Sequence, residues 1–443
     1  MDPVTIGLIG VLLLLILLGK GVHIAIDFFV VGFCGIALLV GFQGAMSFLS
    51  QTMYYTIATP TFCALPLFIL MGAFAAMGSF AQQAYEGIHD LTEGLPGSLA
   101  IATCFGCAAF GAVSGSSLAT AALFGKIVLP EMIRYKYDKP FALGSIAAAG
   151  GFAAMIPPSA GFIVYAIFTE QSIGKLFMAG IFPGILTATA FSVMIILRVI
   201  RNPSLAPGRT TQSEGKEIPA KKSKLVSIRK MWSIALISAI VLGGIYSGFF
   251  TPTEAGAVGA LAAMVIGFQQ GEIRSMSSIK KALRDSAHTT SMIFIIMVGA
   301  LFFGRFLALT RIPSFASNLI IGLNMPRFAV LFGILVVWFL LGMIVIPTGI
   351  MALTLPIFFP IVVSLGYDPI WFGVIIMKLG EIAAITPPVG LNVYALKGVA
   401  GKDTSLEEVF RGVWPFIFCE LVVLGILIVF PQISLFLPNM MGN

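Results

Sequence analysis

Two matched segments of this sequence could bind ions inside an apolar protein. They are residues 150–158 and 380–388, 230 residues apart, and each ends in Pro-Pro within a long apolar stretch. Proline removes a backbone donor and clashes with the preceding helical turn, so both stretches should open into non-helical backbone. The freed carbonyl oxygens can bind sodium, and the positive amino-terminal end of a half-helix can bind an anion. In lipid, such openings are tolerated only where protein or water satisfies the freed groups, which is typical of a transporter's binding region.

A short polar tip between two apolar arms precedes each Pro-Pro segment. The two tips are Ser114-Gly115-Ser116-Ser117 and Ile346-Pro347-Thr348-Gly349. A re-entrant helical hairpin needs such a tip because its turn must satisfy its own backbone groups at membrane depth, although the first tip also suits a small-residue face for helix packing. Candidate oxygen ligands of a first sodium site are Ser114, Gly115, Ser116, Ser117, Ile156, Pro157 and Ser159. Those of a second site are Pro347, Thr348, Thr386 and Asn392. Coupling to protons stays open.

Three charged residues lie inside apolar segments. Arg305 could bind the carboxylate of an anionic substrate bidentately; the alternatives are snorkelling or pairing with an acid. Lys378 and Glu381 are three residues apart on the helix that enters the second break, which predicts an internal ion pair. The sequence has no hydrolytic triad, clustered metal ligands or nucleotide-binding loop, so we expect neither an enzyme nor a cofactor other than coupling sodium.

The composition is that of a membrane protein. Of the 443 residues, 58% are hydrophobic and 10% are charged, and the mean hydropathy is +1.02. An ordinary soluble domain has about 25% charged residues. The length allows roughly ten to fourteen membrane segments, and the sequence lacks the alternating strands of a barrel, so we expect an all-α polytopic protein.

The net charge of +7 is concentrated in one segment. Nine Lys and Arg residues lie between Arg198 and Lys230, against two acids. The positive-inside rule makes this segment a cytoplasmic loop, a better interpretation than nucleic-acid binding. We therefore divide the chain into a first half (1–200), a basic linker (201–230) and a second half (231–443).

Apolar segments, bounded by glycine, proline or polar residues, predict the helices of each half. In the first half these are 4–19, 24–42, 44–58, 61–84, a hairpin at 97–134, a broken helix at 141–168, and 175–199. In the second half they are 231–249, 253–270, 288–308, 311–323, a hairpin at 327–363, a broken helix at 370–398, and 411–437.

The two halves read as one duplicated unit. At the offset of 230, Pro96 matches Pro326, Pro130 matches Pro360, and Tyr137-Asp138 matches Tyr367-Asp368. The corner at 134–139 has three basic residues, whereas its counterpart at 364–369 has none. Since basic loops stay in the cytoplasm, the repeat should be inverted, with both termini on the periplasmic side.

Two segments carry a resemblance to a known family. Thr251-Pro252-Thr253-Glu254-Ala255 and residues 385–392 (Ile-Thr-Pro-Pro-Val-Gly-Leu-Asn) closely resemble the large membrane subunit (DctM-like) of tripartite ATP-independent periplasmic (TRAP) transporters. The likeness extends over nearly the whole chain. The sequence departs from the family pattern at His23 and Asp27, where the family usually has Pro and small apolar residues, and at Arg305.

The resemblance implies a sodium-driven importer of organic-acid anions, such as C4-dicarboxylates or sialic acid, in a bacterial or archaeal inner membrane. It implies an elevator mechanism, a small membrane subunit on a separate chain and a periplasmic solute-binding protein. The alternative is a stand-alone sodium/dicarboxylate symporter. The resemblance places the sodium sites at 114–117 with 156–159 and at 347–349 with 386–392, which adds Gly349 and Pro387 to the candidate ligands. The candidate substrate contacts are Arg305, Ser117, Pro158, Thr348 and Pro388.

Overall fold

The regular elements of the described residues are helices. The computed structural model describes residues 2–207, 224–273, 275–322 and 325–441, so residues 208–223 of the predicted linker lie outside the described residues. The first half and the start of the linker contain α1 (Pro3–Gly19), α2 (Ile24–Ala58), η1 (Pro60–Cys63), α3 (Ala64–Met77), α4 (Phe80–Thr92), α5 (Ser98–Ser114), α6 (Ser117–Arg134), α7 (Lys139–Ala149), α8 (Phe152–Met155), α9 (Ala160–Thr169), α10 (Ile173–Arg201) and η2 (Pro203–Leu205). The remainder contains α11 (Lys224–Lys230), α12 (Trp232–Tyr246), α13 (Pro252–Gln269), α14 (Met276–Leu309), α15 (Ile312–Gly322), α16 (Arg327–Gly342), α17 (Pro347–Ser364), α18 (Pro369–Ile385), α19 (Leu391–Val399), α20 (Leu406–Val429) and α21 (Gln432–Met440).

Both predicted breaks are present. The first separates α8 from α9, and the helix pair bends by 43° there. The second separates α18 from α19, and both Pro-Pro peptide bonds are cis. Each broken helix begins in the same way, because Asp138 and Asp368 cap the backbone N–H groups of α7 and α18.

Both predicted hairpins are also present. The first consists of α5 and α6, and Gly115 at its tip has a φ of +61°, a left-handed conformation that favours glycine. The second consists of α16 and α17, with residues 343–346 between the two arms. The helix predicted at 61–84 was wrong in one respect: it divides at Gly78, whose extended ψ of 171° ends α3 before α4 begins. The predicted 24–42 and 44–58 segments join as α2, with a non-helical residue at Gly41.

Among the described residues, fewer helices are long and apolar enough to cross a membrane than the length of the chain allows. In the described residues, six helices are long and apolar enough to cross a membrane, or seven if the bent α7–α9 segment is one span. Four more apolar helices have only 10–17 residues, and α5 and α16 are among them. Much of the apolar sequence is therefore used in hairpin arms and half-helices, which need not cross the whole bilayer.

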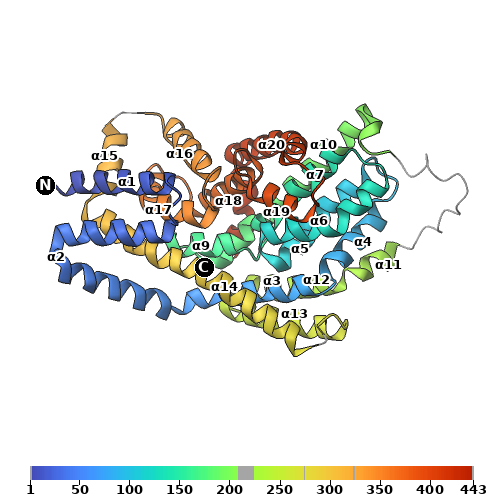
Figure 1. Cartoon of the computed structure of the whole chain (residues 1–443), viewed down its shortest axis with the longest axis horizontal. Coiled ribbons are helices and arrows are strands. Elements are labelled where there is room, and N and C mark those ends of the chain that lie inside the picture. Colours follow the sequence, from blue (N-terminus) through green and yellow to red (C-terminus); the bar gives the residue numbers. More distant parts are fainter. Residues whose placement is uncertain (1, 208–223, 274, 323–324, 442–443) are drawn as a thin grey trace, which may run out of the picture.

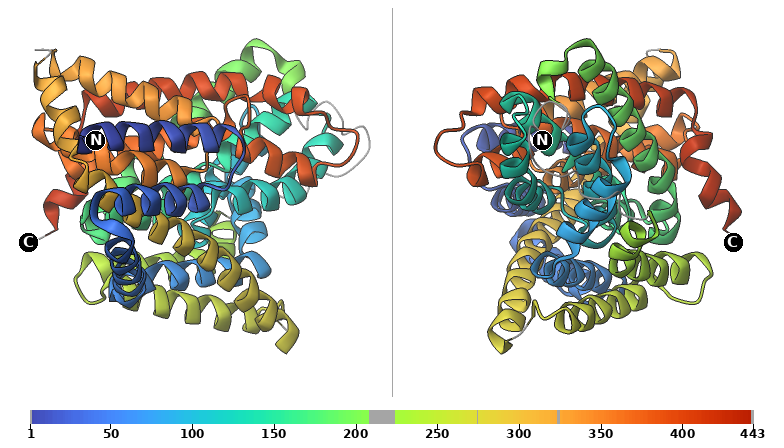
Figure 2. Two further views of the ribbon diagram at one scale, coloured as in Figure 1. Left: turned by 60° about the vertical axis from the view of Figure 1, so that its left-hand side comes forward. Right: turned by 90° about the vertical axis from the view of Figure 1, so that its right-hand side faces the viewer.

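The helices of the two halves are interleaved. α2 packs along α14, and α3 packs along α13, at one side of the molecule (Figure 1, Figure 2). The half-helix α9 packs on α17 of the second hairpin, and the half-helix α19 packs on α6 of the first. Likewise α20 packs on α7, and α10 packs on α18. The hairpins and broken helices thus form one connected unit.

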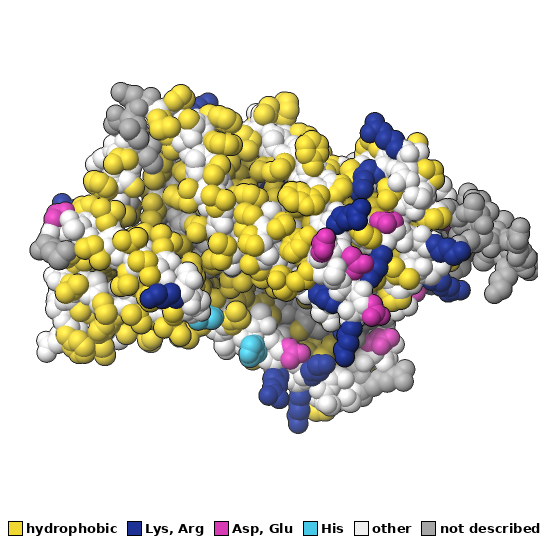
Figure 3. Space-filling model, turned by 45° about the horizontal axis from the view of Figure 1, so that its top comes forward, with side chains coloured by type: hydrophobic (Ala, Val, Ile, Leu, Met, Phe, Trp, Pro, Cys, Tyr) yellow, Lys and Arg dark blue, Asp and Glu magenta, His cyan; other side chains and the backbone are white. Residues whose placement is uncertain are grey.

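Charged side chains gather towards one end of the molecule. Figure 3 shows Lys, Arg, Asp and Glu at the right of one face, while apolar side chains cover most of the remainder. The backbone N–H of Asp138, at the basic corner, donates to the carbonyl of Leu205, where the linker segment begins (3.0 Å). The two segments whose basic residues predict a cytoplasmic position are therefore neighbours.

Candidate ion-binding site at the two helix breaks

The first hairpin tip lies directly against the first break. A Cβ on Gly115 would be 2.9 Å from the carbonyl oxygen of Pro158, closer than real Cβ atoms approach. The arms pack equally closely on the broken helix, because a Cβ on Gly111 would be 2.8 Å from Ala153 Cα. Only glycine allows this approach of backbone to backbone. The structure thus brings residues 114–117 together with residues 156–159.

The hydroxyl groups of Ser114 and Thr120 at this junction form a short hydrogen-bonded chain, and that of Ser159 is buried without a partner among the described residues. The Thr120 hydroxyl donates to the carbonyl of Ser116 (2.8 Å), so the Ser114 hydroxyl is the donor in its 3.0 Å bond with Thr120. The Ser116 hydroxyl accepts from Ala119 N and caps α6. Ser159 is fully buried, and within the described part of the chain its hydroxyl oxygen has no hydrogen-bond partner. Thr120 was missed by the sequence analysis, although it lies one turn after the tip.

The second hairpin packs on α18, the helix that enters the second break. A Cβ on Gly342 would be 2.8 Å from Ala383 Cβ, and one on Gly380 would be 3.9 Å from Pro347. The Thr386 hydroxyl donates to the carbonyl of Ile382 (2.6 Å), one turn earlier on α18. Pro347 and Thr348 are half-buried, whereas Gly349 is buried.

Asn392 connects the second break to the first. It is fully buried on α19, and its Nδ2 donates to the carbonyl of Ala147 on α7 (3.4 Å). Its Oδ1 has no hydrogen-bond partner among the described residues. Sequence analysis grouped Asn392 with Thr348 and Thr386; the structure places its amide beside the first broken helix.

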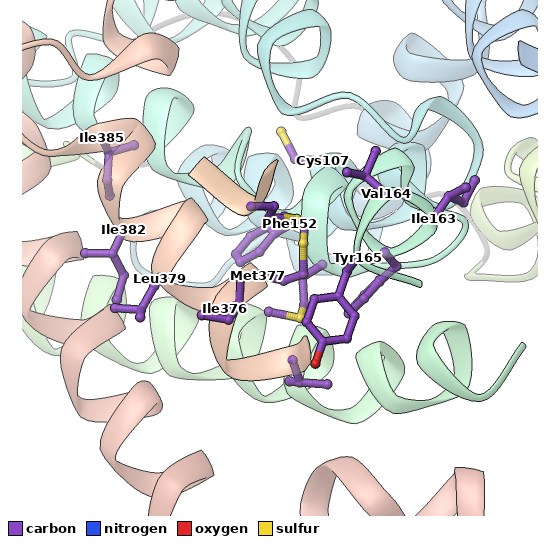
Figure 4. Packing of buried hydrophobic residues seen from close by; sticks show 14 of the residues in the cluster. Cys107, Phe152, Ile163, Val164, Tyr165, Ile376, Met377, Leu379, Ile382 and Ile385 are labelled. Carbon is purple, nitrogen blue, oxygen red and sulfur yellow. The ribbon is translucent and has the colours of Figure 1, made fainter. Parts of the chain in front are cut away.

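Apolar side chains hold the two broken helices together. Figure 4 shows Phe152 of α8, Tyr165 of α9 and Met377 of α18 in one buried cluster. A Cβ on Gly151 would be 3.6 Å from the side chain of Glu381, which occupies the matching position of the repeat. Ser159 and Asn392 are fully buried at the breaks, so their polar atoms must find partners within the protein or in a bound ion.

The oxygen atoms at the breaks fit a small, hard cation. Carbonyl and hydroxyl oxygens suit such ions, whereas transition metals prefer His and Cys ligands. No group of three or more His, Cys, Asp and Glu residues able to hold a metal occurs among the described residues. Among the described residues, the hydroxyl oxygen of Ser159 and Oδ1 of Asn392 are buried at the breaks without a hydrogen-bond partner.

The ion pair predicted for Lys378 and Glu381 is confirmed, and it is part of a larger cluster. Lys378 Nζ lies 2.8 Å from Glu381 Oε2 and also contacts Glu420 of α20. It donates to the hydroxyl of Thr187 on α10 (2.7 Å). Sequence analysis missed Glu420 and Thr187, because nothing local in the sequence links them to α18.

Arg305 lies on α14 next to α2. Its guanidinium carbon is 6.0 Å from the centre of the Phe48 ring, within the range of a cation–π interaction. Arg305 is half-buried, and its helix also contacts α17 of the second hairpin.

The comparisons with known proteins identify the family. Residues 9–433 match the model described as "Tripartite ATP-independent periplasmic transporter, DctM component". The chain belongs to this family of TRAP transporter large permease proteins. It is 38% identical over 350 residues to the C4-dicarboxylate TRAP transporter large permease protein DctM of Pseudomonas aeruginosa, which covers 78% of each chain. It is 31% identical to the ectoine/5-hydroxyectoine TRAP transporter large permease protein UehC of Ruegeria pomeroyi, over 97% of this chain and 98% of the other.

A solved structure has a similar fold. The crystal structure of the Alcanivorax borkumensis YdaH transporter matches with a TM-score of 0.63, covering 98% of this chain and all of the other. The sequences are only 14% identical, so the likeness concerns the fold of this TRAP permease and not its substrate.

Proposed function

We propose that this TRAP large permease is a sodium-coupled secondary transporter that imports organic-acid anions by an elevator mechanism. The observation that carries the proposal is the junction of a hydroxyl-bearing hairpin tip with a Pro-Pro break, where Gly115 touches the Pro158 carbonyl. Such a junction concentrates carbonyl and hydroxyl oxygens without a buried carboxylate, which suits sodium. The unpartnered oxygens of Ser159 and Asn392 support an ion at this depth.

In this proposal the hairpins and broken helices move as one body. α6 contacts α19 and α9 contacts α17, so neither hairpin can shift far without the broken helix of the other half. The α2–α14 and α3–α13 pairs are the proposed scaffold. An inverted repeat would place the two hairpin tips on opposite sides of a central substrate site, which alternating access requires. We place the basic corner and the linker in the cytoplasm, and both termini in the periplasm.

The proposed substrate is an organic-acid anion. The name of the Pseudomonas aeruginosa relative states C4-dicarboxylate, and that of the Ruegeria pomeroyi relative states ectoine and 5-hydroxyectoine. We favour a C4-dicarboxylate, sialic acid or a similar acid, held near Ser117, Pro158, Thr348 and Pro388. A small membrane subunit and a periplasmic binding protein complete the proposed complex.

Uptake into reconstituted vesicles tests the proposal. The complex with its small subunit and binding protein should accumulate a labelled C4-dicarboxylate when sodium is higher outside than inside. Ser116→Ala with Ser117→Ala should weaken the sodium dependence, and so should Thr348→Ala with Thr386→Ala. The control is Thr289→Ala with Ser291→Ala, which removes two exposed hydroxyls of α14 that bond only to their own helix.

Three outcomes would count against parts of this proposal. If both double variants keep the wild-type sodium response, the ion sites are not at the tips and breaks. If uptake ignores the sodium gradient, sodium is not the coupling ion. If the permease transports equally well without the binding protein, it acts as a stand-alone symporter.

A further inference from the structure

A buried acid–base cluster joins three helices beside the second break. Lys378 of α18 is fully buried, and Glu381 and Glu420 expose only 3% and 2% of their surface. The Lys378 ammonium contacts a carboxylate oxygen of each glutamate and donates to Thr187. Because both carboxylates touch the same nitrogen atom, they also lie close to each other.

The charges of this cluster do not balance when all three groups are ionised. Two carboxylates face one ammonium, which leaves an excess negative charge. Two neutral groups of the described residues also face the cluster: the Thr187 hydroxyl of α10 and the Cys419 thiol of α20. Within the described part of the chain, the charged groups acting on Glu381 are Lys378 and Glu420. The other charged residues on helices packed against α18 lie near helix ends.

Each glutamate has a buried carboxylate oxygen without a hydrogen-bond partner among the described residues: Oε1 of Glu381, and Oε2 of Glu420, which contacts Lys378 as an ion pair. The other oxygen of Glu381, Oε2, binds Lys378. Gly151 of the first broken helix lies against the Glu381 side chain of the second, and its lack of a side chain leaves room for that glutamate. A metal cation is disfavoured here, because the ammonium already occupies the position between the carboxylates and would repel it. Two close carboxylates in a buried site typically share one proton.

We propose that Glu381 and Glu420 share one exchangeable proton beside the charged Lys378. The proton makes the buried cluster neutral, and the broken helix α18 then carries a proton site in addition to any sodium site. This inference does not depend on the proposed sodium sites or substrate, since it follows from the charges and contacts of α10, α18 and α20.

Infrared difference spectroscopy of the purified protein, comparing samples in water and in deuterium oxide, tests this inference. The wild type should show the C=O stretching band of a buried protonated carboxyl at neutral pH, with a shift on exchange into deuterium oxide. Glu381→Gln should remove the band, because Glu420 and Lys378 then balance each other as a one-to-one ion pair. Glu420→Gln should remove it for the same reason. Glu407→Gln, at an exposed position on α20, is the matched control and should keep the band.

Three results would overturn the inference. The wild type could lack a protonated-carboxyl band at neutral pH, or the band could persist in both glutamine variants. The band could also disappear in Glu407→Gln. If one glutamine variant does not fold, the other decides, because only loss of the band in a glutamine variant assigns it to this cluster rather than to Asp27, which is also fully buried.

Discussion

Replacing Gly115 by alanine tests the contact between the first hairpin tip and the first break. Gly115 has a φ of +61°, so an alanine there costs about 1–2 kcal/mol for its left-handed backbone. Its Cβ would also be 2.9 Å from the Pro158 carbonyl, and such overpacking typically costs about 1–3 kcal/mol. We therefore expect Gly115→Ala to destabilise the protein by about 2–5 kcal/mol and to push the tip away from the break.

The assay is thermal unfolding of the purified protein with sodium and with choline as the replacement cation. Ligand at 100 times its dissociation constant stabilises a protein by about 2.7 kcal/mol, so the wild type should unfold at higher temperature in sodium. Gly115→Ala should lose most of this difference. Gly94→Ala is the matched control: its φ is +92°, but a Cβ there meets nothing within 4 Å. A full sodium effect in Gly115→Ala would refute the reasoning.

Three further substitutions, one of them with a matched control, probe contacts of the fold. Gly412→Ala should destabilise by about 1–3 kcal/mol through a clash of α20 with the Pro140 carbonyl, whereas Gly425→Ala, with open space around it, should not; unfolding of each variant checks this. Lys230 bonds to Asp90 (2.8 Å), and this hydrogen bond raises the pKa of Lys230. The contribution of this pair to the free energy of unfolding should therefore be complete below about pH 10.4, the ordinary lysine pKa, and should decrease at higher pH. Lys230→Met should lower the free energy of unfolding by up to about 1 kcal/mol below that pH and by less above it. Arg305→Gln should lower the free energy of unfolding by about 0.5–1 kcal/mol through the lost Phe48 contact and leave the sodium response of uptake intact. A changed sodium response would indicate that Arg305 belongs to the transport site.

Local sequence signals predicted much of the architecture. The Pro-Pro pairs locate both breaks, because proline acts on the backbone of its own turn. Gly115 and its serine neighbours locate the first tip, because a glycine with left-handed φ lies where a helix must reverse. Lys378 and Glu381 were predicted as a pair, because residues three apart share one helix face.

Contacts between distant segments could not be predicted in the same way. Glu420 joins Lys378 across 42 residues, and Asn392 reaches Ala147 across 245 residues. These contacts depend on how α20 and α19 pack on other helices, which no single-segment pattern encodes. The division at Gly78 was missed because neither a proline nor a charged residue marks it. The sodium ligands stay predictions.

Equilibrium binding of radioactive sodium to the purified protein tests the central claim most directly. We predict saturable binding that weakens by roughly tenfold, about 1.4 kcal/mol, in Ser159→Ala, which removes the buried hydroxyl oxygen left without a partner. Ser145→Ala is the matched control, because that serine is also fully buried but donates to the carbonyl of Ala142 (2.8 Å); it should bind sodium as the wild type does. Wild-type protein without saturable sodium binding, or Ser159→Ala with undiminished affinity, would contradict a sodium site at the first break.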